Sequence, residues 1–280
     1  MKYILYNPLS RNGSNLESVK EKYSNEENAT LISVLDNDQY METIKSLSID
    51  DELILVGGDG TLNHFINDSK DIDIPCDIFF NTSGTGNDFY NDIKKSDDNE
   101  LIKINDYIKD LPRVIVNDKE YLFINGVGFG IDGYCCEVGD DLQKKSNKPV
   151  NYTSIAIKGL LFKYKRPNAK VTVDGVCKEY KRVWLAPTMK GRYYGGGMIV
   201  APEQDRNNKE KLLSNVVMHK KGKLKTLMVF PSIFKGEHVK HTKMVDIRTG
   251  HHIIVEFDRP TALQIDGETI RNVLKYEVIA

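Results

Sequence analysis

The stretch from Leu53 to Asn63 constrains the fold more than any other part of the sequence. Its first four residues, Leu-Ile-Leu-Val, are all apolar, as in a strand that is buried on both faces of a parallel sheet. Residues 57–60, Gly-Gly-Asp-Gly, then end the strand, and Thr61 is the expected N-cap of a short helix through Phe65 and Ile66. The sequence therefore predicts a strand, a tight turn and a helix start in direct succession.

This turn has the features of a phosphate site. Glycines at 57, 58 and 60 let the backbone approach an anion closely, and the free N–H groups of a helix start point at it. Asp59 would repel phosphates unless a cation lay between them, so Mg²⁺ is implied. The alternative, from this stretch alone, is a tight turn in which Asp59 only caps a helix.

Length and charge limit the class of protein. A chain of 280 residues is longer than a typical single domain, so one large or two medium domains are expected. Hydrophobic content of 40% and charged content of 28% are ordinary for a globular protein. The formal net charge of -1 argues against a general nucleic-acid binder.

The N-terminal half alternates strand and helix patterns, which predicts a parallel sheet with helices on both faces. Asn7 lies in the polar loop after the first strand, and residues 81–89 form a second loop rich in glycine and hydroxyl groups. Ligands bind at this edge in open α/β sheets, although Asn87 and Asp88 could instead cap the next helix. The expected strands are Tyr3–Tyr6, Thr30–Leu35, Glu52–Val56 and Cys76–Asn81.

The C-terminal half has a different character. After Pro112, a hairpin is expected at Asn117–Asp118, and from Ala169 onward strands follow one another, which predicts a mostly antiparallel domain. Residues 125–132 contain alternating glycines, but we interpret them as a crossover that approaches the ligand cleft rather than a dinucleotide motif. Residues 153–164 show helical spacing of apolar residues and predict one amphipathic helix.

Cysteines and basic residues bear on location. The four cysteines show no CxxC spacing, so reduced thiols in a cytoplasmic protein are expected. No apolar run reaches the roughly 20 residues that span a bilayer, so membrane contact would be peripheral. The run from Lys144 to Arg192 is strongly basic, with only Asp174 and Glu179 as acids. Such a run is either a solvated face or a surface for anionic lipid.

Five motifs together resemble the diacylglycerol kinase catalytic-domain family, in its soluble bacterial branch. They occur in the family's order and span nearly the whole chain: Asn7-Pro8, residues 57–63, residues 84–89, residues 194–197 and Asp266-Gly267-Glu268. The resemblance implies an NAD kinase/phosphofructokinase-like α/β nucleotide domain and a β-sandwich-like C-terminal domain. The implied ATP-binding domain comprises residues 1–122 together with residues 270–280, which return to it at the end of the chain. Residues 123–269 form the implied β-rich lipid-substrate domain.

The resemblance implies an ATP- and Mg²⁺-dependent lipid kinase, with conversion of diacylglycerol to phosphatidic acid as the leading reaction. Phosphoryl transfer needs positioned phosphates, neutralised charge and an oriented nucleophile. Glu268 is the candidate base for the lipid hydroxyl, and Asp266 is the second choice. The implied phosphate-binding residues are Gly57, Gly58, Gly60 and Thr61, and the residues implied to contact the nucleotide are Asn7, Thr85 and Asn87. Asp59 and Asp88 are the implied Mg²⁺ ligands, and Asp59 is also expected to be catalytic.

Two departures from the family pattern leave alternatives open. His64 stands where the family has Glu, and residues 202–211 lack the Asp-Gly pair that some members use for a structural Mg²⁺. NAD kinase and a non-catalytic nucleotide-binding regulator are the competing functions. The expected partners are ATP and a lipid at the membrane surface, not nucleic acid. The identity of the lipid and a homodimer are left open.

Overall fold

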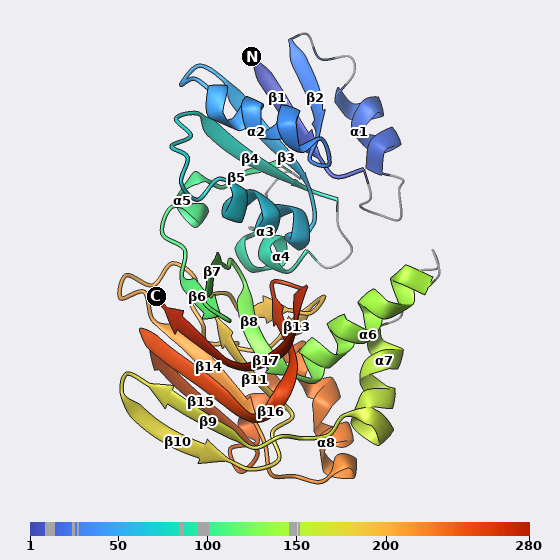
Figure 1. The fold of residues 1–280 in the computed structure, drawn as a ribbon, viewed down its shortest axis with the longest axis vertical. Helices are drawn as coiled ribbons and strands as arrows, with labels where there is room; N and C mark the ends of the chain where they lie inside the picture. Colours follow the sequence, from blue (N-terminus) through green and yellow to red (C-terminus); the bar gives the residue numbers. More distant parts are fainter. Residues whose placement is uncertain are drawn as a thin grey trace. The chain divides into compact units, whose positions relative to one another are not determined.

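The computed structural model of the chain describes residues 1–8, 15–23, 26, 28–83, 87–94, 101–145, 150 and 152–280. The chain divides into two compact units, Met1–Leu111 and Pro112–Ala280 (Figure 1). The sequence assigned residues 112–122 and 270–280 to the first domain, whereas here they lie in the second unit. The reason is that the last strand pairs with a strand that begins just after Pro112.

The first unit is an α/β layer structure around a five-stranded sheet with the order β2-β1-β3-β4-β5. The first four of these strands run parallel, as predicted, and β5 joins antiparallel to β4. The strands are β1 (Lys2–Tyr6), β2 (Ala29–Ser33), β3 (Glu52–Gly57), β4 (Asp77–Thr82) and β5 (Leu101–Lys103). The helices are α1 (Asn15–Tyr23), α2 (Asn37–Ser46), α3 (Asp59–Asp68), α4 (Asp88–Ile93) and α5 (Asn105–Ile108).

Burial explains why β3 forms where it does. Its residues from Leu53 to Gly57 are all buried, which suits a strand with a neighbour on each side and cover on both faces. Side chains from β1 and β3 pack with Val19 and Tyr23 of α1. The hydroxyl of Tyr23 accepts a 2.8 Å hydrogen bond from Asn81, which ties α1 to the end of β4.

The second unit is built on a large antiparallel sheet, as predicted. The order is β15-β14-β11-β8-β16-β17-β6-β7, and β9 pairs with both β10 and the first part of β16. Its strands are β6 (Arg113–Val116), β7 (Lys119–Leu122), β8 (Gly126–Gly130), β9 (Ala169–Val173), β10 (Val176–Tyr180), β11 (Leu185–Met189), β14 (Leu213–Met218), β15 (Val245–Gly250), β16 (His252–Ile265) and β17 (Glu268–Ile279). A separate two-stranded ribbon joins β12 (Tyr193–Tyr194) to β13 (Met198–Ile199).

The alternating glycines of β8 serve strand packing. A Cβ at Gly128 would lie 2.6 Å from the Cα of Pro187 in β11, and one at Gly126 would lie 2.7 Å from the sulfur of Met189. These contacts agree with our interpretation that the segment is not a dinucleotide motif. The helix α6 (Ile131–Lys145) that follows β8 was not predicted.

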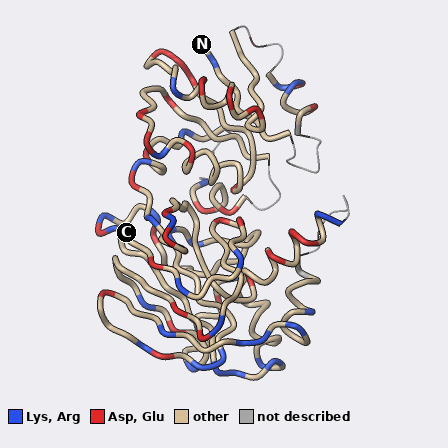
Figure 2. The backbone as a smooth tube through the Cα atoms, viewed as in Figure 1, with Lys and Arg blue, Asp and Glu red and all other residues tan. Residues whose placement is uncertain are grey.

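The remaining helices of this unit lie next to one another. Where the sequence predicted one helix over 153–164, α7 (Tyr152–Lys158) passes into a π-helical turn, η2 (Gly159–Lys163). Gly159 lets this turn pack closely against α6, because a Cβ there would lie 2.7 Å from a side-chain atom of Ile131. The other helices are α8 (Lys223–Val229), η3 (Phe230–Lys235) and η4 (Glu237–Lys240). Lys and Arg residues are frequent in and next to η2 and α8 (Figure 2).

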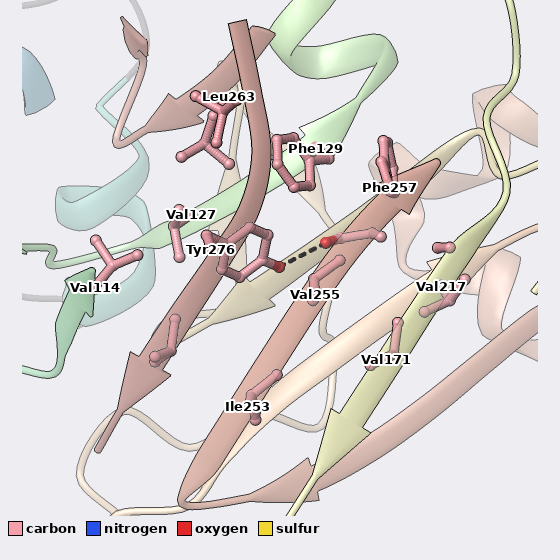
Figure 3. Packing of buried hydrophobic residues seen from close by; sticks show 14 of the residues in the cluster. Val114, Val127, Phe129, Val171, Val217, Ile253, Val255, Phe257, Leu263 and Tyr276 are labelled. Atoms are coloured by element: carbon pink, nitrogen blue, oxygen red, sulfur yellow. Dashed lines mark hydrogen bonds between the residues drawn. The ribbon is translucent and has the colours of Figure 1, made fainter. Parts of the chain in front are cut away.

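The core of the second unit is formed by buried side chains that its strands contribute. Phe129 of β8 stacks on Phe257 at a centroid distance of 4.6 Å, and the hydroxyl of Tyr276 donates a 2.7 Å hydrogen bond to the carbonyl of Ala186 (Figure 3). Arg248 of β15 donates to backbone carbonyls of residues 171 and 176 in β9 and β10. These side-chain bonds connect the outer strand β15 to β9 and β10, so the sheet wraps around its core.

Candidate functional site

The strand order of the first unit defines its ligand edge. The chain places β2 on one side of β1 and β3 on the other, so the sheet has a topological switch point between β1 and β3. Open α/β sheets bind ligands at the carboxyl ends of the strands that flank such a point. Asn7 follows β1, and the Gly57–Thr61 motif follows β3. The predicted phosphate loop therefore lies at the edge that the topology favours.

The helix α3 begins three residues earlier than predicted. Its first residue is Asp59 and its N-cap is Gly58, so the prediction of Thr61 as the N-cap is wrong. Thr61 is buried inside the first turn, beneath Gly57, where an added Cβ would lie 2.4 Å from the Cβ of Thr61. The N-cap residue Gly58 has no side chain with which to cap this helix start. Its first N–H groups have no partner within the helix and therefore suit an anion.

Asp59 connects the two glycine-containing loops. Its carboxylate accepts hydrogen bonds from the backbone N–H of Asp88 at 2.8 Å and of Phe89 at 2.9 Å. The Phe89 ring is buried edge-on against Phe80 and Tyr107, which fixes the start of α4. Asp59 thus caps a helix, as in the alternative that we weighed, and this helix is α4. A carboxylate can accept further bonds, so this role is compatible with cation binding.

Polar atoms gather where β4 ends. Asn87 has a left-handed backbone with φ of 49° and precedes α4 as its N-cap residue. Among the described residues, neither Oδ1 of Asn87 nor Oγ1 of Thr82 has a hydrogen-bond partner, and both atoms are buried. Such atoms fit the polar groups of a ligand at this edge. The predicted contact Thr85 lies outside the described residues.

The donor set suits Mg²⁺. In the described part of the chain, no group of three or more His, Cys, Asp or Glu residues could hold a metal ion. Mg²⁺ does not require such a group, because it commonly takes one or two carboxylates together with substrate phosphates and water. The backbone N–H of Asp88 donates to the Asp59 carboxylate, so the two residues are neighbours at the start of α4 and are the candidates for this oxygen set.

The second unit has its own polar site, at the hairpin between β16 and β17. Asp266 and Gly267 form the two-residue turn with φ of 47° and 99°. The Asp266 carboxylate accepts the backbone N–H groups of residues 124, 125 and 126 at 2.7–2.9 Å. It is buried, with 7% of its surface exposed. Asp266 therefore anchors the hairpin to the start of β8.

A buried arginine completes this anchor and was missed by the sequence reasoning. Arg206 donates to the carbonyl of Ile124 and, at 2.9 Å, to Oδ1 of Asn125. The carbonyl of Asn125 also accepts the backbone N–H of Lys190 at 2.9 Å. Arg206 lies in the stretch 202–211 that departs from the family pattern. That departure was the only signal in the sequence that pointed to it.

Glu268 lies on the other side of the turn. It is exposed, opens β17 and pairs with Ile265 across the hairpin. The pKa of Cys136 in α6 is raised mainly by burial and by other charged groups, and the charge of Glu268 makes a smaller contribution in the same direction. Asp266 binds three backbone N–H groups, whereas Glu268 is presented at the surface. Of the two candidate bases, Glu268 is therefore the more accessible to solvent.

The structure also reveals a buried acid, Asp132, at the start of α6. Burial raises its pKa to about 6. The backbone N–H groups of Asp132 and Gly133, and then the side chains of Gln264 and Tyr194, lower this pKa and partly offset the effect of burial. Among the described residues, no donor reaches either carboxyl oxygen with good hydrogen-bond geometry. No pattern in the sequence distinguishes this residue from the rest of the 125–132 stretch.

The comparisons with known proteins agree with this architecture. Residues 2–114 match the family described as "Diacylglycerol kinase catalytic domain", and residues 125–276 match "YegS C-terminal NAD kinase beta sandwich-like domain". This chain therefore belongs to the diacylglycerol kinase catalytic-domain family, as the sequence motifs predicted. The predicted fold class, an α/β unit followed by an antiparallel β unit, is confirmed.

Individual relatives are distant. The Bacillus subtilis protein named "Putative lipid kinase YtlR" is 27% identical over 67% of this chain and 64% of its own length. A diacylglycerol kinase of Mycobacterium tuberculosis is 26% identical over 68% of this chain and 62% of its own length. The chain thus spans less than two thirds of these relatives. A Bacillus anthracis diacylglycerol kinase structure shares the fold, with a TM-score of 0.61 and 18% identity over 99% of this chain and 93% of that one.

Proposed function

We propose that this chain is an ATP- and Mg²⁺-dependent lipid kinase that phosphorylates a lipid hydroxyl group. Diacylglycerol is the first acceptor to test, and its product would be phosphatidic acid. The observation that carries the proposal is the bond between Asp59 and the start of α4. It joins the uncapped start of α3 to the Asn87–Asp88 loop, at the edge that the switch point marks for a ligand. The family and the names of the relatives support the choice of a lipid acceptor.

In this proposal the first unit binds the nucleotide. The N–H groups at the start of α3, between Gly58 and Thr61, bind phosphate oxygens, and Gly57 lets Thr61 pack close beneath them. Asn7, Thr85 and Asn87 contact the nucleotide. Asp59 and Asp88 would hold Mg²⁺, which when bound neutralises the charge on the phosphates.

The second unit supplies the proton acceptor. As the lipid oxygen forms its bond to the γ-phosphorus, the bond from that phosphorus to the ADP oxygen breaks, and the hydroxyl proton passes to Glu268. Asp266 acts through the backbone, because its three accepted N–H bonds fix the hairpin that presents Glu268. A positioned carboxylate typically contributes about 10²–10⁴-fold to such a step.

The proposal includes work at a membrane. None of the helices within the described ranges is long and apolar enough to span a bilayer. We propose reversible docking of a cytoplasmic protein on an anionic membrane, where the acceptor resides. A homodimer stays open, and analytical ultracentrifugation of the purified chain would decide it.

The direct test supplies γ-labelled ATP, Mg²⁺ and a total lipid extract, and identifies the labelled product. Label in phosphatidic acid or another lipid phosphate, lost when EDTA is added, is the expected result. A parallel reaction with NAD in place of lipid tests the competing activity. Label in NADP, or no Mg²⁺-dependent label in any lipid, would contradict the proposal.

The role of Glu268 has a separate test. Glu268→Gln keeps the shape of the side chain and removes the base, so kcat should fall by about 10²–10⁴-fold while nucleotide affinity changes little. Glu256→Gln, an exposed position on β16, is the matched control. If ATP affinity collapsed and turnover at saturation were unchanged, Glu268 would be a binding or structural residue instead.

A further inference from the structure

Three helical segments of the second unit expose large apolar side chains. Phe162 of η2 is 74% exposed, Leu224 of α8 is 73% exposed and Met228 is 62% exposed. Ile157 of α7 is also exposed. Single exposed apolar residues are common, but these belong to elements that contact one another.

The contacts between these segments are specific. Lys223, at the start of α8, donates a 2.7 Å hydrogen bond to the carbonyl of Leu161 in η2. The Arg166 guanidinium lies 4.8 Å from the Trp184 ring and donates at 2.8 Å to the carbonyl of Lys221. The indole N–H of Trp184 donates to the same carbonyl. The end of η2 and the start of α8 are therefore held together, and their exposed side chains belong to one surface.

Helix geometry gathers the apolar groups. Leu224 and Met228 are four residues apart in α8 and so lie on one face. Ile157 and Phe162 are five residues apart, a spacing that a regular α-helix would place on different sides. The π-helical turn, closed by the N–H of Tyr164 and the carbonyl of Gly159 at 2.9 Å, reduces this offset.

The segments α7, η2, α8 and η3 are basic and contain no acidic residue. The sequence contains no Asp or Glu from Leu142 to Val173 or from Lys211 to Gly236. The cations that belong to α7, η2, α8 and η3 or to the residues next to them are Lys158, Lys163, Lys165, Arg166, Lys220, Lys221, Lys223, Lys225 and Lys235. The basic run that the sequence suggested is divided in the structure. Lys178 pairs with Asp246, and Lys190 is buried, so neither belongs to this surface.

We propose that α7, η2 and α8 form a docking surface for an anionic phospholipid bilayer. Phe162, Leu224 and Met228 enter the boundary between headgroups and acyl chains, and the lysines around them meet lipid phosphates. Lysine and protruding apolar residues together are typical of interfacial helices, whereas protein–protein interfaces are depleted in lysine. The role of this surface rests on the proposed function, since a lipid kinase must reach an acceptor that resides in the bilayer.

Two double variants test the proposal by sedimentation with vesicles of phosphatidylcholine, with and without phosphatidylglycerol. Lys163→Gln/Lys225→Gln should weaken binding to the anionic vesicles about 25-fold, since each lysine near such a surface is worth about 1 kcal/mol, or about five-fold. Lys45→Gln/Lys109→Gln, at exposed positions of the first unit, is the control. Equal binding by both double variants and the wild type would overturn the proposal.

Insertion has its own readout, because the only tryptophan of the chain, Trp184, is fully buried. Phe162→Trp should gain an emission that brominated lipids in anionic vesicles quench, while Ile49→Trp, at an exposed site of the first unit, should not. Equal quenching of both, or of neither, would exclude docking through η2. Phe162→Asn/Leu224→Asn should lose at least ten-fold in vesicle binding and retain activity on a short-chain acceptor in solution. Patch-dependent binding by a protein without kinase activity would refute the proposed function and leave the docking surface in place.

Discussion

Asp132 provides a prediction that can be worked from its surroundings. Burial at the start of α6 raises its pKa from 3.8 to about 6. A folded-state pKa above the unfolded value means that the stability of the fold is complete below about pH 4 and is lost progressively as the pH rises to about 6. At 1.36 kcal/mol for each pH unit between the two pKa values, the loss amounts to about 3 kcal/mol.

Asp132→Asn removes this loss because the amide stays neutral. The difference in unfolding free energy between variant and wild type should therefore grow in favour of the variant by up to about 3 kcal/mol between pH 4 and pH 7. The neighbouring Cys135, whose pKa burial raises to about 12, and Tyr194, whose pKa burial raises well above its usual value, do not titrate in this range. Urea unfolding at four pH values measures the difference, with Asp118→Asn, an exposed turn residue, as the control for removal of a charge. Parallel curves for variant and wild type would show that Asp132 does not carry this pH dependence.

Two further predictions concern the loops that build the site. Gly57→Ala places a Cβ 2.4 Å from Thr61, so it should cost about 1–3 kcal/mol in thermal unfolding and weaken ATP binding; Gly222→Ala, where a Cβ meets nothing within 4 Å, should cost less. Arg206→Met removes hydrogen bonds from a buried cation to residues 124 and 125, so it should cost about 2–3 kcal/mol and lower kcat. The exposed Arg113→Met is its control, and equal effects from the two would contradict the anchoring role.

The first unit could be predicted from local patterns. The apolar run before Gly57 and the glycines after it are short-range signals, and strand β3 begins where the sequence placed it. The predicted start of α3 was wrong by three residues, because Thr61 has an N-cap side chain but is buried under Gly57. The position of β5 antiparallel to β4 could not be predicted, since nothing local distinguishes it from a parallel edge strand.

The site in the second unit depends on long-range contacts. The Asp-Gly turn and the exposed Glu268 follow from adjacent residues, but the three donors to Asp266 lie about 140 positions away. Arg206 likewise acts on a segment about 80 positions earlier. The burial of Asp132 follows from the packing of α6 against β16, and the sequence around it reads only as a glycine-rich segment.

The most direct test of the account compares Asp59→Asn with the wild type in Mg²⁺-dependent phosphorylation of diacylglycerol in mixed micelles. The variant should still fold, at a cost of about 1 kcal/mol, because its amide oxygen can keep one of the two bonds to α4. Its Mg²⁺-dependent transfer of γ-phosphate should be nearly abolished. Wild-type turnover and an unchanged Mg²⁺ requirement in the folded variant would contradict the claim that Asp59 holds the cation at a phosphoryl-transfer site.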